Sequence, residues 1–210
     1  MDDPISVGVL SLHTSKDTKA ILNTVNELGH RGQWLREDNL IVDIENGSVT
    51  IEPDVDVIVN RLLLSKTEQP AELLGLAKSL SRLRPTLNRP GNVLTAFHKF
   101  ATATTMVESE IRVPDALLAL DERRLNELRT KFGDEVVYKT AIGTHGGGTW
   151  KIGPEEEVNP RVGDRFAFLQ ELIETPDGSK ESDLRVYVVD DEIVAAMRRT
   201  APENDWRTNV

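Results

Sequence analysis

The sequence predicts a mixed α/β protein (α+β), in which a small N-terminal α/β domain with a parallel sheet, residues 1–92, precedes a second domain, residues 93–210. Two patterns support this prediction. The apolar run Ile5–Leu10 does not alternate, as in a strand buried on both faces, and a helical segment follows it; this order is typical of a parallel sheet. Within residues 134–152, two extended segments enclose a glycine-rich turn. The boundary is expected at residues 90–92, where proline and glycine indicate a loop.

The N-terminal domain is expected to continue with alternating strands and helices. Ile21, Val25 and Leu28 recur at helical spacing, and Gly29 follows as a stop signal. Asn-Gly at 46–47 lies between two extended runs and is a strong hairpin signal. The expected elements are a helix at 16–28, a hairpin at 41–44 and 48–51, a strand at 55–60, a helix at 70–83 and a short strand at 86–87.

The second domain is expected to contain two helices and five strands. Asp121 has the side chain of a good N-cap, so it predicts the start of the second helix. Val136, Val137 and Tyr138 are β-branched or aromatic and favour a strand. The expected helices are 93–110 and 121–131, and the expected strands are 135–140, 149–152, 166–173, 183–189 and 192–198.

Composition excludes several classes of function. With 25 basic and 35 acidic residues the formal charge is −10, which argues against binding to nucleic acid or to an anionic membrane. The absence of cysteine excludes disulfides and thiolate sites and fits a cytoplasmic protein. The four histidines lack the spacing of metal ligands, so no metal site is predicted within these residues. No apolar run approaches the roughly 18 residues of a membrane span.

The glycine-rich turn is a candidate phosphate site. Gly146, Gly147 and Gly148 can adopt backbone angles closed to other residues, and they follow a strand that carries Lys139 near its end. Successive backbone amides beside a lysine make a concavity that binds anions. The P-loop and dinucleotide patterns both fail, the latter because Lys151 replaces the third glycine. The alternative interpretation is a mobile hairpin loop without a ligand.

Three polar residues follow the first strand: His13, Thr14 and Ser15. Ligands of open parallel sheets bind beyond the carboxyl ends of the strands, so these residues are candidate substrate contacts. A solvated turn is the alternative for each of them.

The second half of the chain has a distinctive order of parts. A helix carrying Lys99 precedes the Lys139 strand and the glycine turn; the segments Gln170–Ile173, Asp183–Val186 and Arg207–Asn209 follow. This order resembles the ATP-grasp superfamily, and within it the RimK-like glutamate ligases. The resemblance rests on motifs for residues 93–210 and on pattern alone for residues 1–92. It implies an ATP-grasp domain that is incomplete, because the family's last, metal-binding segment is expected beyond residue 210.

The resemblance implies roles for individual residues. Lys99 and Lys139 would contact the nucleotide phosphates, and the three glycines would close over them. Arg207 would be catalytic, because a cation there stabilises charge on an acyl phosphate. The remaining ATP-binding positions would be Gln170, Glu171 and Leu172 at the adenine hinge, Asp183 near the ribose, and Thr208 and Asn209 beside Arg207.

Each role has a plainer alternative, and the chain departs from the family pattern twice. Lys99 could be a solvated helix lysine, Asp183 a turn aspartate that pairs with Arg185, and Arg207 a surface arginine. The family usually has aspartate where this chain has His98, and serine where it has Thr208.

The implied function is an ATP-dependent carboxylate–amine ligase or the N-terminal portion of one. A substrate carboxylate, on a small molecule or a protein tail, attacks the γ-phosphate of ATP, and an amine, commonly that of glutamate, then displaces phosphate. ATP and magnesium are the implied cofactors, with magnesium ligands expected beyond residue 210, so the isolated chain is expected to turn over poorly. The alternatives are a non-catalytic nucleotide-binding or regulatory module that has lost its metal segment, and a plain α/β binding domain whose glycine loop is only a hairpin. Association into a homo-oligomer stays open.

Overall fold

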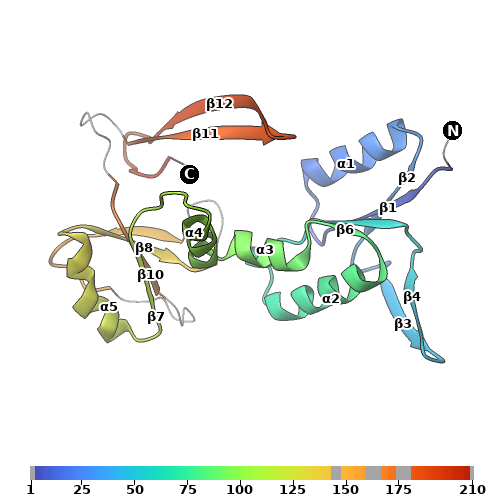
Figure 1. Cartoon of the computed structure of the whole chain (residues 1–210), viewed down its shortest axis with the longest axis horizontal. Helices are drawn as coiled ribbons and strands as arrows, with labels where there is room; N and C mark the ends of the chain where they lie inside the picture. Colours follow the sequence, from blue (N-terminus) through green and yellow to red (C-terminus); the bar gives the residue numbers. More distant parts are fainter. Residues whose placement is uncertain (1–2, 143–147, 159–166, 174–180, 209–210) are drawn as a thin grey trace. The chain divides into compact units, whose positions relative to one another are not determined.

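The computed structural model describes residues 3–142, 148–158, 167–173 and 181–208, which form two compact units that meet between residues 97 and 98 (Figure 1). The mixed α/β class predicted from the sequence is confirmed, including the N-terminal parallel sheet. The unit border lies beyond the predicted boundary at residues 90–92, because α3 (Pro90–Phe97) contacts α2 (Pro70–Leu83) of the first unit. The assignment of the units as separate domains stays a prediction.

The first unit is built on a parallel sheet with the strand order β2-β1-β5-β6. Its strands are β1 (Ser6–Leu10), β2 (Arg31–Leu35), β5 (Val57–Asn60) and β6 (Thr86–Leu87). Every residue of β1 is buried, as the unbroken apolar run predicted. Helices α1 (Lys16–Glu27) and α2 lie on opposite faces of this sheet in Figure 1.

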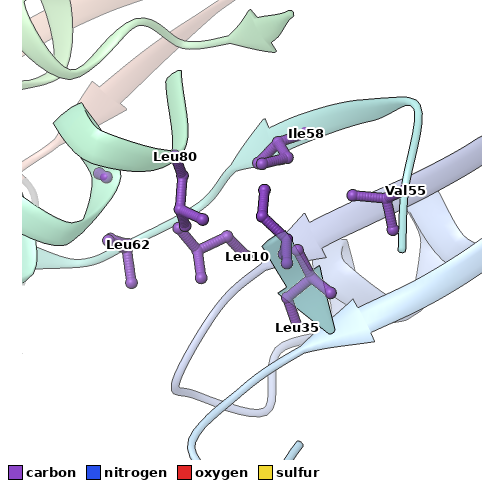
Figure 2. Close-up of a cluster of buried hydrophobic side chains, with 8 residues drawn as sticks. Leu10, Leu35, Val55, Ile58, Leu62 and Leu80 are labelled. Carbon is purple, nitrogen blue, oxygen red and sulfur yellow. The ribbon is translucent and has the colours of Figure 1, made fainter. Parts of the chain in front are cut away.

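The core of this unit lies between the sheet and α2. Leu10, Leu35 and Ile58 have no exposed surface, and Leu80 of α2 is 1% exposed. Figure 2 shows these side chains converging with Val55 and Leu62. Burial of each such side chain contributes roughly 1.5–3 kcal/mol relative to exposure in water, so this cluster fixes the position of α2 on the sheet.

Local signals define the ends of α1 and the tip of the β3–β4 hairpin. The Ser15 hydroxyl accepts a hydrogen bond from the backbone N–H of Thr18 at 3.0 Å, which caps α1, and Gly29 ends it with φ of +83°. Strands β3 (Ile41–Glu45) and β4 (Ser48–Glu52) join through Asn46 and Gly47, both at positive φ. The Asn-Gly hairpin signal is therefore confirmed.

The second unit contains an antiparallel sheet with the order β7-β10-β8-β9. Its strands are β7 (Ala116–Ala119), β8 (Val136–Thr140), β9 (Thr149–Ile152) and β10 (Ala167–Glu171). Asp121 caps α5 (Glu122–Leu128) as predicted, by accepting from the N–H of Arg123 at 2.9 Å. Leu125 of α5 packs on one face of the sheet against Val136, Tyr138 and Leu169.

A separate two-stranded ribbon follows the sheet. Strands β11 (Ser182–Val189) and β12 (Glu192–Thr200) turn at Asp190 and Asp191, which have φ of 49° and 65°. This hairpin was predicted. A β-bulge between Tyr187 and Val188, which the pattern did not indicate, shifts the pairing register by one residue.

Three elements differ from the sequence-based expectations. The helix predicted at 93–110 is two helices, α3 and α4 (Lys99–Glu108), because His98 between them is extended and forms a β-bridge with Ile142. Strand β2 was missed because its residues are largely polar, and β7 because Ala and Leu have weak strand preference. Two short 3₁₀ helices, Leu64–Lys66 and Arg129–Phe132, complete the described elements. No helix in the described part of the chain has the length and apolarity that crossing a bilayer requires.

Removal of core volume in the first unit will test this packing. We expect Leu10→Ala to lower the free energy of unfolding by about 2–5 kcal/mol, because its side chain is fully buried and a cavity would remain. Leu28→Ala is the matched control, since Leu28 is 70% exposed, and its effect should stay within about 0.5 kcal/mol. Urea denaturation measures both; equal effects would contradict the described core.

Candidate functional site

The antiparallel sheet of the second unit has one apolar face and one polar face. Lys139 of β8 lies opposite Thr149 of β9, and Val137 lies opposite both Lys151 of β9 and Gln170 of β10. Residues directly opposite each other share a face of the sheet, so the two lysines and Gln170 project from the same face. The other face packs on α5. The predicted phosphate lysine and hinge glutamine are therefore brought together on the polar face.

The start of α4 is bonded to the end of β8 at this face. The backbone N–H of Lys99 donates to the carbonyl oxygen of Ala141 at 2.8 Å, and its Nζ donates to that of Thr140 at 2.8 Å. One residue along, Phe100 contacts Phe168 of β10 edge-on, with ring centroids 5.9 Å apart. Lys99 thus reaches the same strand that carries Lys139, although the two residues are far apart in the sequence.

The two lysine side chains form a partly buried cationic pair. Burial lowers the pKa of Lys99 below the ordinary value, and the neighbouring charge of Lys139 lowers it further. Burial also lowers the pKa of Lys139, whose Nζ donates a short hydrogen bond to Oε1 of Gln170. Both directions mean that burial at this site disfavours the charged forms of the two lysines. A bound polyanion would remove this penalty.

His98 explains one departure from the family pattern. It is the N-cap of α4, and its Nδ1 accepts a hydrogen bond from the backbone N–H of Ala101 at 3.2 Å. An aspartate carboxylate is the common side chain for this purpose. The imidazole therefore caps α4 at the position where the resemblance leads one to expect an aspartate.

Gly148 stands at the base of the glycine-rich turn. Its carbonyl oxygen accepts from the N–H of Thr140 at 2.8 Å, and a Cβ atom at this position would lie 2.2 Å from Oγ1 of Thr140. A side chain at this position would require the side chain of Thr140 to move. Gly146 and Gly147 lie outside the described residues.

Glu171 at the end of β10 is bonded to the chain just before β7. Its backbone N–H donates to the carbonyl oxygen of Asp115 at 2.9 Å, and its Oε1 accepts from the N–H of Asp115 at 3.0 Å. The N–H of Glu171 is therefore already bonded within the protein. A heteroaromatic ring at this strand end would have to bind backbone groups that follow it, those of Leu172. Adenine recognition by these residues stays a prediction.

Asp183 on β11 joins the ribbon to the C-terminal segment. Arg199 of β12 binds its carboxylate with two donors, Nε to Oδ1 at 2.7 Å and Nη2 to Oδ2, and Oγ1 of Thr208 donates to Oδ2 at 2.6 Å. These bonds, that from Arg199 first, lower the pKa of Asp183. The structure thus brings two predicted nucleotide residues together, and the partner of Asp183 is Arg199 instead of Arg185.

Arg207 is held by a neighbour in its own turn. Asp205 accepts from Nε of Arg207 at 3.0 Å and from Nη2 at 2.6 Å, which lowers the pKa of Asp205 to about 2. Asn209 lies outside the described residues. The segment 201–207, Glu181 and Thr149–Lys151 of β9 line a cleft of about 710 Å³. Arg207 therefore lines the same cleft as the strand that follows the glycine turn.

The candidate substrate residues of the first unit have structural tasks. Ser15 caps α1, and the carbonyl oxygen of His13 accepts from Oγ of Ser11 at 2.9 Å. Thr14 is exposed at the same turn. A substrate contact by these three residues stays a prediction.

The sequence analysis did not identify two charged residues that lie beside the candidate site residues of the second unit. Lys151 lies on the polar face and pairs with Glu135 at 2.7 Å; its alternation with Thr149 in the predicted strand was the available signal. Arg199 was missed because the β-bulge shifts the strand register by one residue. Without the bulge, the pairing that starts at the Asp190–Asp191 turn would place Arg198 opposite Asp183, and with it Arg199 takes that position.

Comparisons with known proteins agree on the kind of domain. A family model described as the RimK-like ATP-grasp domain matches residues 96–210. The tetrahydromethanopterin:alpha-L-glutamate ligase of Methanocaldococcus jannaschii is 29% identical over 141 residues, which are 63% of this chain and 47% of that protein. A probable alpha-L-glutamate ligase of Mannheimia succiniciproducens is 24% identical over 203 residues, 89% of this chain and 67% of that protein. This chain thus spans about half to two thirds of the length of these relatives.

Solved structures show the same fold. A RimK-domain ATP-grasp protein from Sphaerobacter thermophilus superimposes with a TM-score of 0.64 at 15% identity, over 98% of this chain and 75% of that one. The ATP-grasp ligase PsnB, in complex with a minimal precursor, Mg and ADP, gives a TM-score of 0.62 at 16% identity, over 96% of this chain and 72% of that one.

The contact of Gly148 with Thr140 predicts a strong effect of one methyl group. We expect Gly148→Ala to lower the free energy of unfolding by about 1–3 kcal/mol, because the new Cβ would overlap Oγ1 of Thr140. The double variant Gly148→Ala/Thr140→Ala should recover most of this loss. Gly75→Ala in α2, where a Cβ meets nothing, should instead stabilise by up to about 1 kcal/mol. Thermal unfolding of all three measures this.

The lowered lysine pKa values predict a specific dependence of stability on pH. Above the folded-state pKa of Lys99 and Lys139 and below their ordinary value of about 10.4, the unfolded chain binds more protons, so stability rises with pH. We therefore expect the unmodified chain to gain stability relative to the Lys99→Met/Lys139→Met variant as the pH rises toward about 10. Lys78→Met, at an exposed position in α2, is the control. Parallel pH profiles for the double variant and the unmodified chain would contradict the cationic pair.

Proposed function

Because the chain belongs to the RimK-like ATP-grasp family, as its order of motifs predicted, we propose that its second unit binds ATP on the polar face of β10, β8 and β9. The cationic pair supports this most directly. Lys99 and Lys139 come from different elements and are partly buried, and the charge of Lys139 lowers the pKa of Lys99 in addition to burial. The phosphates of a nucleotide would interact favourably with both charges.

The other parts of the site fit the length of a nucleotide. The end of β10, with Gln170, Glu171 and Leu172, would read the adenine edge, while Asp183 would accept a ribose hydroxyl. The glycines at 146–148 would cover the phosphates, where backbone N–H groups suit an anion. Arg207 would contact the transferred phosphoryl group, with Thr208 and Asn209 beside it; Arg207 and residues of β9 line one cleft, which supports this placement.

Magnesium is also implied by the family resemblance, with its ligands expected beyond residue 210. The described residues contain no cluster of three His, Asp or Glu side chains that could hold a metal ion. The roles proposed here for the lysines and Arg207 depend on the charge and position of these side chains alone.

We further propose that the whole protein is an ATP-dependent carboxylate–amine ligase that uses glutamate as the amine. The curated relatives are named alpha-L-glutamate ligases, and they support this substrate. A substrate carboxylate would attack the γ-phosphorus of ATP and release ADP. The glutamate amine would then attack the acyl carbon, form the amide and release inorganic phosphate. The acceptor is a carboxylate on a small molecule or on a peptide tail.

The residues of this chain would contribute position and charge. The two lysines would hold the phosphates in line with the acceptor carboxylate, and such positioning accounts for much of the catalysis of phosphoryl transfer. Arg207 would stabilise the negative charge that develops on the acyl phosphate. Its pairing with Asp205 fixes the orientation of the guanidinium before substrate arrives.

Thermal unfolding with nucleotide tests the binding site. We expect ATP with magnesium to raise the unfolding midpoint of the chain, because a ligand that binds the folded state stabilises it by about 2.7 kcal/mol at a hundredfold excess over Kd. Lys139→Ala should lose this response. Lys131→Ala, at an exposed site near α5, is the control and should keep it. A midpoint that ATP leaves unchanged would overturn the nucleotide site.

Release of ADP tests the reaction. Glutamate-dependent ADP release with a carboxylate acceptor, lost in Arg207→Gln, would support the ligase. The assay uses the whole protein, because the isolated chain is expected to turn over poorly, and ATP binding by the whole protein without any such release would instead favour a non-catalytic nucleotide-binding module.

A further inference from the structure

We propose that Arg199 is a positioning residue of the nucleotide site: it orients the carboxylate of Asp183 and, through that carboxylate, holds Thr208 and the turn that carries Arg207. This inference rests on the proposed function for its consequence in nucleotide binding. The contacts on which it depends are independent of that function.

The geometry of the contact is specific to arginine. Asp183 and Arg199 lie directly opposite each other on β11 and β12, so their side chains share a face of the ribbon. The guanidinium donates through Nε and Nη2 to the two different carboxylate oxygens, which is the bidentate arrangement. Two parallel bonds fix the plane of the carboxylate as well as its distance. A lysine would neutralise the charge without fixing that plane.

The oriented carboxylate has one acceptor position left for a ligand. An ionised carboxylate accepts about four hydrogen bonds, two at each oxygen. Oδ2 of Asp183 accepts from Arg199 and from Thr208, and Oδ1 accepts from Arg199. Within the described part of the chain, the second lone pair of Oδ1 is the position at which a ribose hydroxyl could bind. Arg199 therefore determines where that lone pair points.

The same carboxylate holds the C-terminal turn. Oγ1 of Thr208 donates to Oδ2 of Asp183 at 2.6 Å, and the neighbouring Arg207 is fixed to Asp205. The backbone N–H of Ala201 donates to the carbonyl oxygen of Glu181 at 2.8 Å, which holds the start of the same segment to the start of β11. The segment 201–208 is thus held at both ends, and the Thr208 end depends on the orientation that Arg199 imposes.

The neighbouring arginine provides a matched control. Arg198 lies opposite Leu184 on the other face of the ribbon, and its Nη1 donates to Oγ of Ser182 at 3.1 Å. Arg198→Gln and Arg199→Gln remove the same charge from adjacent positions of one strand. A difference between them reports on the contact with Asp183 and not on the net charge of the ribbon.

Backbone order parameters from NMR test the contact without any nucleotide. We expect residues 205–208 to fall from rigid values near about 0.85 to below about 0.6 in Arg199→Gln and in Asp183→Asn. Arg198→Gln should leave them unchanged, and Arg199→Lys should give an intermediate result. If residues 205–208 stay rigid in Arg199→Gln while the variant is folded, the inference is overturned.

Nucleotide analogues test the consequence for the site. We expect ATP to raise the unfolding midpoint of the unmodified chain more than 2′-deoxyATP or 3′-deoxyATP does, and we expect Arg199→Gln to lose this preference while Arg198→Gln keeps it. A role in folding alone would lower the midpoint without nucleotide and leave the preference intact, which would contradict a positioning role. If ATP has no effect on the unmodified chain, the proposed function fails, and the order parameters still decide whether Arg199 holds the turn.

Discussion

Two partly buried lysines, Lys99 and Lys139, lie at one face of the antiparallel sheet, and the other candidate site residues of the second unit are described relative to them. Burial lowers the pKa of both Lys99 and Lys139, and the charge of Lys139 lowers that of Lys99 further, so holding both side chains charged costs free energy. The cost is tolerated because α4 is bonded to the end of β8 by backbone hydrogen bonds and the Phe100–Phe168 contact holds it there. An anion that binds both lysines would remove this cost, and the free energy regained would add to its affinity. The polar face of the sheet is therefore suited to an anionic ligand.

Close backbone contacts support the site as much as side chains do. Gly148, directly before β9, lies so close to Thr140 of β8 that a Cβ atom would overlap the threonine side chain. The position of Gly148 relative to β8 is therefore defined. Glu171 uses both its amide and its carboxylate to close the end of β10 onto the chain before β7. On the ribbon, one carboxylate collects an arginine and a threonine. Each of these positions therefore serves the local fold, and any contact with a nucleotide would be added to that task.

The sequence predicted features that depend on local chemistry and missed those that depend on distant partners. Caps and turns such as Asp121 and Asn46-Gly47 lie where expected, because each acts on its own neighbours. The break at His98 was not predictable, since residues 93–110 are helix-compatible and the interruption comes from bonds to residues 141 and 142. For the site, residue types and order indicated Lys99 and Lys139 as phosphate contacts, which stays a prediction; the structure places both lysines at the end of β8. The partner of Asp183 could not be read from the sequence, because a single bulge decides which arginine faces it.

The ribbon of β11 and β12 exposes apolar side chains, which affects how copies of the chain interact in solution. Leu184, Val186 and Val188 on one face are 65%, 48% and 58% exposed, and Tyr187 and Met197 on the other are 43% and 47% exposed. A net charge of −10 keeps copies of the chain apart, but that repulsion is screened over about 10 Å at 0.1 M salt, whereas apolar contacts are not weakened by screening. Dilute buffer should therefore keep the chain dispersed, and added salt should promote self-association through these strands.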